Sequence, residues 1–92
     1  MNFVIDTKVA PAGVICHLYV LDLGEEVWKT YISVQPAGHL LTTGGWGADE
    51  GEARRLLRKE IEREISKWSN HRDPRPSQLR RRDLLSEALP TI

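Results

Sequence analysis

The sequence predicts a small α+β protein: an antiparallel sheet of three to four strands, then one long amphipathic helix on one face, then a short C-terminal helix or tail. Two observations predict this class. Apolar stretches separated by Gly and Pro fill the first 43 residues, whereas apolar residues recur every three or four positions after residue 49. A chain of 92 residues builds one core, so we expect a single domain over residues 1–69 and a basic C-terminal segment over residues 70–92.

Four strands are expected, over residues 3–9, 14–23, 27–35 and 39–43. The second, VICHLYVLDL, is apolar on both faces, whereas the third, VWKTYISVQ, alternates. One helix covers only one face of the sheet, so the other face needs a second cover. The C-terminal segment, a second copy of the chain or a target protein could each supply it, and Tyr19 and Tyr31 are the candidate residues of this interface.

The long helix is expected over residues 49–68. Its apolar stripe has the helical spacing of three and four and comprises Ala53, Leu57, Ile61, Ile65 and Trp68. We expect Trp28 and Trp46 to pack against Trp68 and this helix, because large aromatic side chains are usually buried.

The stretch TTGGWGADEGE, residues 42–52, precedes this helix and superficially resembles a phosphate-binding loop. Carboxylates at the helix N-terminus would repel a phosphate, and the stretch lacks the Gly-Lys-Ser/Thr sequence of such a loop. Asp49 as N-cap instead puts Glu52 at the third helical position, the spacing of a capping box. We therefore expect a structural hinge and no cofactor.

The segment SQLRRRDLLSEAL, residues 77–89, predicts a second, shorter helix with Ser77 as N-cap and Pro90 as stop. Its leucines form no single stripe. This leaves open whether it docks loosely or becomes ordered only on a partner.

Catalytic and metal-binding patterns are weak. Cys16 is the single cysteine, and neighbouring residues of a strand point to opposite faces, so Cys16 and His17 cannot jointly bind one ion. His39 and His71 are solitary, although Cys16, His17 and His39 assembled in three dimensions remain an alternative. We expect a non-enzymatic protein without catalytic residues or a metal.

Basic residues gather in the second part of the chain. Residues 1–50 hold two basic and six acidic residues, whereas residues 51–92 hold eleven basic and seven acidic ones. Four cations recur every fourth residue on the long helix and form a ridge beside the apolar stripe: Arg55, Lys59, Arg63 and Lys67. Glutamates at helical spacing pair with some cations, as Glu60 with Arg63, Glu64 with Lys67 and Arg58 with Glu62. Three consecutive arginines follow in the C-terminal segment, Arg80, Arg81 and Arg82.

These features predict a binding module that contacts nucleic acid, or another polyanion such as an acidic protein surface, through the ridge and the arginine-rich segment. The alternative is a protein-interaction module or inhibitor, of the mobile-element or phage accessory type, that uses the open sheet face and the tail. It could act as a homodimer. No apolar run is long enough for a membrane helix, and we expect a cytoplasmic protein.

Overall fold

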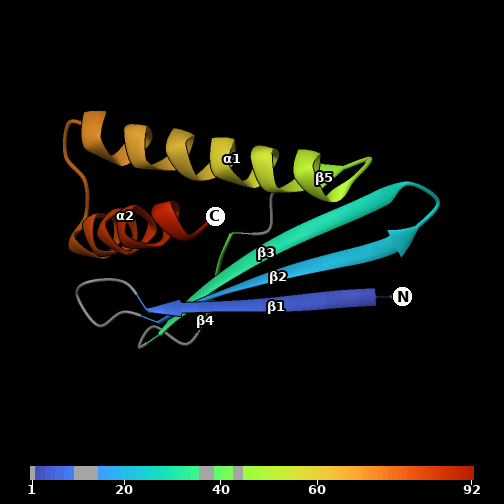
Figure 1. The fold of residues 1–92 in the computed structure, drawn as a ribbon. Coiled ribbons are helices and arrows are strands. Elements are labelled where there is room, and N and C mark those ends of the chain that lie inside the picture. The colour runs from blue at the N-terminus through green and yellow to red at the C-terminus, as the bar shows by residue number, and fades with distance from the viewer. Residues whose placement is uncertain (1, 10–14, 36–38, 43–44) are drawn as a thin grey trace.

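The computed structural model shows an antiparallel sheet packed against two helices (Figure 1). It describes the backbone of residues 2–9, 15–35, 39–42 and 45–92, and the side chains of residues 6–7, 15–33 and 45–92. The strands are β1 (Asn2–Val9), β2 (Ile15–Gly24), β3 (Val27–Gln35), β4 (His39–Thr42) and β5 (Trp46–Gly47). The helices are α1 (Glu50–Asn70), α2 (Pro76–Ala88) and the 3₁₀ helix η1 (Leu89–Thr91). The predicted α+β class is confirmed.

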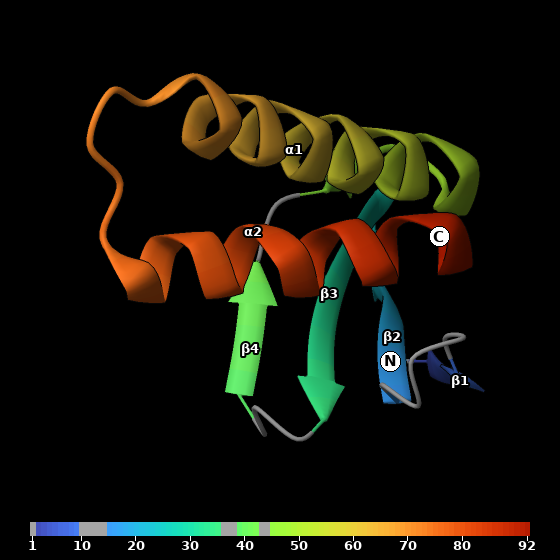
Figure 2. The same cartoon turned by 90° about the vertical axis from the view of Figure 1, so that its left-hand side faces the viewer.

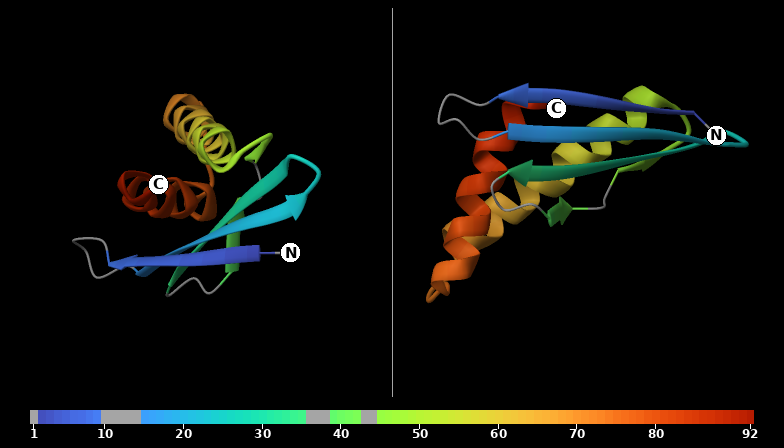
Figure 3. Two further views of the ribbon diagram at one scale, coloured as in Figure 1. Left: turned by 45° about the vertical axis from the view of Figure 1, so that its right-hand side comes forward. Right: turned by 90° about the horizontal axis from the view of Figure 1, so that it is seen from below.

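The strands follow the order β1-β2-β3-β4, and all described pairs are antiparallel. β4 pairs with the C-terminal half of β3, while β5 pairs with its N-terminal half through Trp46 opposite Lys29. The expected strand 39–43 is thus present as β4, and Thr43 lies outside the described residues. Both helices lie on the same side of the sheet (Figures 2 and 3).

The core lies between the sheet and this helical layer. Alternate residues of β2 and β3 face the helices, and the register puts Leu18 opposite Ile32. The largest apolar side chains that are fully buried here are Leu18, Ile32, Leu57, Ile61, Leu85 and Val20. These contacts confirm the predicted apolar stripe at Leu57 and Ile61 of α1.

α2 contributes to this same core. Leu85 and Ala88 are fully buried, and Leu84, Leu89 and Ile92 pack against the core at its margin. Leu84, Leu85 and Ala88 therefore lie on one side of α2, and Leu79 lies outside this group. The helix begins one residue earlier than expected: Arg75 is the N-cap and Pro76 the first helical residue, so Ser77 is not the cap. Proline suits the first helical position, because the N–H group that it lacks would have no helical partner there.

Asp49 caps α1 as the sequence predicts. Its Oδ1 accepts a hydrogen bond of 2.8 Å from the backbone N–H of Glu52, and its backbone is extended. The carboxylate therefore satisfies one of the unpaired N–H groups of the first turn.

We expect Asp49→Ala to lower the free energy of unfolding by about 1 kcal/mol, the usual value of such a cap. Urea denaturation followed by circular dichroism measures this change. Asp49→Asn keeps a capping oxygen and should lose less, and equal losses for the two variants would show that the cap hydrogen bond does not matter.

The β2–β3 turn places two glutamates in an unusual backbone conformation. Glu25 and Glu26 have φ angles of 55° and 60°. Positive φ at both central residues is the pattern of a type I′ hairpin turn, which favours Asn-Gly, because a side chain at positive φ meets its own backbone. The hairpin forms despite this local cost.

The double variant Glu25→Asn/Glu26→Gly should therefore raise the free energy of unfolding by about 1 kcal/mol. Thermal unfolding would detect this change. The control Glu25→Gln/Glu26→Gln removes both charges but keeps the unfavourable backbone, and should leave stability nearly unchanged. Equal stabilisation by both variants would show that removal of the two negative charges, and not the backbone conformation, causes the gain in stability.

Candidate nucleic-acid interface

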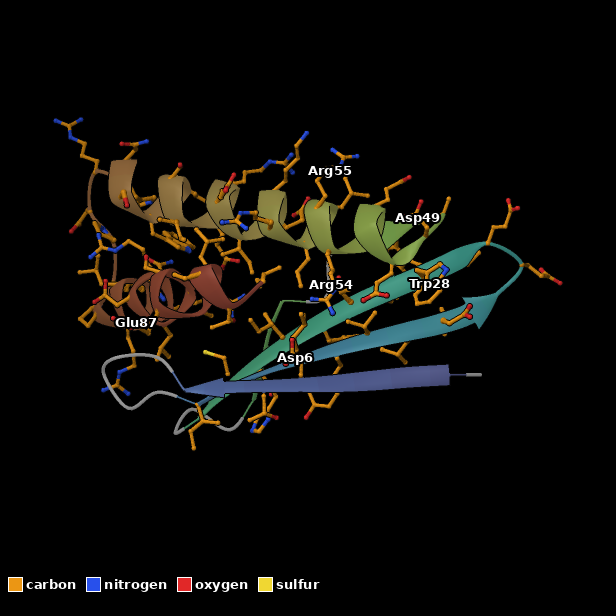
Figure 4. The ribbon with its side chains drawn as sticks, viewed as in Figure 1. Asp6, Trp28, Asp49, Arg54, Arg55 and Glu87 are labelled. Atoms are coloured by element: carbon orange, nitrogen blue, oxygen red, sulfur yellow. The ribbon has the colours of Figure 1, made fainter. Side chains whose placement is uncertain are left out.

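The four cations of the predicted ridge all lie on the exposed side of α1. Arg55, Lys59, Arg63 and Lys67 are exposed, and Figure 4 shows Arg55 pointing away from the sheet while Arg54 points toward it. Lys67 lies twelve positions after Arg55, which corresponds to about 18 Å along a helix. The ridge is uninterrupted, because α1 is continuous over 21 residues. It runs obliquely along the helix, since each step of four residues advances about 40° around the axis.

Ion pairs compensate only part of this charge. Arg63 pairs with Glu60 at 2.9 Å, but its side chain remains 73% exposed. Arg55 and Lys59 form no ion pair within the described part of the chain. Lys67 lies with its Nζ 4.6 Å from the centre of the Trp68 ring. Exposed pairs are weak in water, so a phosphate group can compete with Glu60 for Arg63.

The carboxylates beside the ridge pair in two ways. Arg58 contacts Glu62 at 3.5 Å, as the spacing predicts. Glu64, expected to pair with Lys67, is bound by Arg81 of α2 instead. The guanidinium Nε and Nη2 of Arg81 donate to the two carboxylate oxygens, the second at 3.3 Å. Both side chains are half-buried between the helices, so Arg81 ties α2 to α1.

The three consecutive arginines of α2 do not form one patch. Neighbouring helical residues point about 100° apart, so a sequence cluster is dispersed around the helix. Arg81 is directed to Glu64, and Arg82 pairs with Asp83 at 3.0 Å. Arg80 is exposed and lines an open groove of about 460 Å³ with Pro76, Leu79, Asp83, Leu84 and Glu87. Arg80 is thus the member of the triplet that has no ion pair among the described residues.

Cys16 and His17 lie on opposite faces of the sheet. Cys16 is buried toward the helices, and burial raises the pKa of its thiol. The ring Nδ1 of His17, on the other face, lies 3.0 Å from Thr7 Oγ1. Cys16 and His17 therefore cannot bind the same ion, and the alternative of a metal site formed by Cys16, His17 and His39 is wrong. The side chain of His39 lies outside the described residues. Across the side chains that the structure describes, no three His, Cys, Asp or Glu residues gather as metal ligands would.

The sheet face away from both helices, the open face, carries Tyr19 and Tyr31. These two residues are partners in the β2–β3 register and are half-buried. The view from below in Figure 3 shows the strands in front of both helices, with no described element over them. α2 packs on the helical side, so the C-terminal segment is not the cover for this face. Among the large apolar side chains described, those most exposed are Ile15, Leu23, Val27 and Trp46.

Trp46 corrects one sequence-based expectation. It does not pack against Trp68: its side chain is 51% exposed and its ring centre lies 3.9 Å from Lys29 Nζ. Trp28, in contrast, packs against the core under α1 (Figure 4), which confirms the expected contact with this part of the molecule. The expected packing against Trp68 is not seen, because Trp28 lies opposite Gly47 near the start of α1. Trp68 lies beside His71, with ring centres 5.5 Å apart. Trp46 lies on the open face because it pairs with Lys29, which the alternation of β3 puts on that face. The sequence did not predict this position, because a strand of two residues is too short to show periodicity.

Comparison of the chain with protein families, with curated proteins and with solved structures found no match. None of the described helices is both long and apolar enough to cross a lipid bilayer.

Proposed function

We propose that the protein is a non-enzymatic binding module for nucleic acid, which grips the phosphate backbone through the α1 ridge. The observation that carries this proposal is the row of four exposed cations at successive turns of one continuous helix, with Arg55 and Lys59 free of ion pairs among the described residues. Such a row of cations can contact the regularly spaced phosphates of a nucleic-acid backbone, and these contacts need no binding pocket. Arg80 is a further candidate contact on α2.

Direct binding tests the proposal. Fluorescence anisotropy of a labelled DNA duplex and a labelled RNA duplex, each titrated with the purified protein, should show saturable binding at low salt. Binding should be nearly independent of base sequence, because phosphate contacts carry no sequence information directly. A heparin fragment should compete, since it presents a comparable array of anions. The absence of binding to either duplex at low salt would reject the proposal.

The open face favours a second candidate, a protein-interaction module or inhibitor. Ile15 and Val27 are each more than one-third exposed there, and exposed apolar patches often mark interfaces. The occupant would be a second copy of the chain or a target protein that covers Tyr19 and Tyr31. Sedimentation equilibrium addresses the homodimer: a stable dimer dissociated by Tyr31→Ala, combined with no affinity for nucleic acid, would favour this candidate over the first.

A further inference from the structure

Trp46 is held in an exposed position by the close packing of its two neighbours. A Cβ added to Gly45 would lie 2.7 Å from the carbonyl oxygen of Ala53, and one added to Gly47 would lie 2.5 Å from the Ala53 nitrogen. The backbone on both sides of Trp46 is thus pressed against the first turns of α1. β5 also pairs with β3, so the backbone that carries the ring is fixed on both sides. The ring stays exposed although burial of its apolar surface would lower the free energy.

An aromatic row extends from Trp46 across the open face. Lys29 Nζ lies 3.9 Å from the centre of the Trp46 ring and 5.0 Å from that of Tyr31. Tyr31 is the register partner of Tyr19 on β2, and the ring centres of Tyr19 and His17 are 6.5 Å apart. The rings of Trp46 and Tyr31 therefore lie beside the Lys29 ammonium group, and those of Tyr19 and His17 continue the row on β2.

The charge of this face distinguishes between occupants. Among the described strand residues whose side chains lie on the open face, Lys29 carries a charge and none is Asp or Glu. Glu25 and Glu26 lie at the hairpin tip. Two copies packed face to face would enclose two ammonium groups without a carboxylate from these positions, which is unfavourable. A ligand with planar rings and negative charge fits the row better.

We propose that the aromatic row, formed by Trp46, Tyr31, Tyr19 and His17 with Lys29, stacks the bases of single-stranded nucleic acid while Lys29 contacts a phosphate. Base stacking on aromatic side chains is tolerant of sequence, because every base has a π-face. The inference rests on the proposed function in naming nucleic acid as the ligand, but it uses the opposite side of the molecule. Arg55 of the ridge points away from the sheet (Figure 4), and the strand register puts the row on the open face.

A short probe separates the two surfaces. A labelled oligouridylate hexanucleotide can occupy the row without reaching the ridge, whereas a DNA duplex cannot offer unstacked bases. We expect Trp46→Ala to weaken hexanucleotide binding roughly ten- to a hundred-fold and to leave duplex binding unchanged. Trp46→Phe keeps a ring and should retain most of the affinity, whereas Trp46→Leu is apolar without a ring and should behave as Trp46→Ala. Because Trp46 is exposed, each variant should fold, as circular dichroism can verify.

The outcomes are distinct. If wild-type protein binds the duplex, but hexanucleotide binding is absent or unaffected by Trp46→Ala, the stacking site is refuted and the proposed function stands. If neither probe binds, both are refuted. Equal hexanucleotide affinities of Trp46→Leu and Trp46→Phe would show that the site needs an apolar side chain and not an aromatic ring, which would overturn the stacking mechanism. A stable dimer in sedimentation equilibrium that Trp46→Ala dissociates would likewise overturn it in favour of a second copy.

Discussion

Gly45→Ala is expected to lower the free energy of unfolding by roughly 2–4 kcal/mol, from overpacking together with an unfavourable backbone angle. The added Cβ would lie 2.1 Å from Thr30 Oγ1 and 2.9 Å from Leu57 Cβ, and Gly45 has a φ of 92°. Thr30 cannot move aside easily. It is fully buried, its Oγ1 lies 3.2 Å from the Ala53 carbonyl oxygen, and its backbone N–H donates to the Gly45 carbonyl at 3.2 Å.

Gly51→Ala is the matched control for this prediction. Gly51 lies in the first turn of α1, and an added Cβ would meet only the Asp49 Oδ1 atom, at 3.4 Å. Alanine favours helix over glycine by up to about 1 kcal/mol, so this variant should be unchanged or more stable. Thermal unfolding resolves the difference, because 1 kcal/mol shifts the midpoint by about 4–8 °C in a domain of this size. A Gly45→Ala midpoint equal to that of the wild type would contradict the observed approach of β3, β5 and α1.

Charge reversal of the ridge is expected to have the largest effect on binding. The triple variant Arg55→Glu/Lys59→Glu/Arg63→Glu replaces three cations with anions on one side of α1. We expect duplex affinity to fall by at least about 100-fold, since each lost phosphate contact contributes about 1 kcal/mol and the new carboxylates repel the backbone. The fold should persist, because all three side chains are exposed and the one ion pair lost, between Arg63 and Glu60, is a weak surface pair.

A change of net charge elsewhere is the control for this variant. Arg72→Glu/Arg75→Glu places new carboxylates in the connection between α1 and α2, where both residues are exposed. If binding depends on the ridge, this double variant should lose much less affinity per charge than the triple variant. Equal losses per reversed charge would show that overall charge, and not the ridge, governs binding.

Local patterns predicted most of the fold. A continuous apolar run located β2, and alternation located β3. The two-residue period of a strand puts Cys16, Leu18 and Val20 on one face, and the structure buries all three. Helical spacing located α1, and the Asp49 cap followed from side-chain chemistry within one turn. β5 escaped prediction since it is two residues long and exists only by pairing with Trp28 and Lys29.

The candidate sites depend more on tertiary contacts. The ridge was predictable, because cations four residues apart must share one side of a helix. The fate of Arg81 was not, since its partner Glu64 is 17 residues away on another helix. The side of α2 that packs on the core was not predicted, because one of its buried residues is Ala88. A small residue contributes little to an apolar pattern, yet it allows the helix to approach the core closely. Trp46 was expected in the core on composition alone, whereas two glycine contacts hold it at the surface.

The salt dependence of duplex binding tests the ridge most directly. Phosphate contacts release counterions, so the logarithm of the binding constant should fall linearly with the logarithm of salt concentration, by about 0.9 per contact on duplex DNA. Four ridge contacts predict a slope of about −3 to −4 for the wild type and a much shallower slope for the triple variant. A slope near zero, or one that the triple variant leaves unchanged, would contradict phosphate recognition by α1.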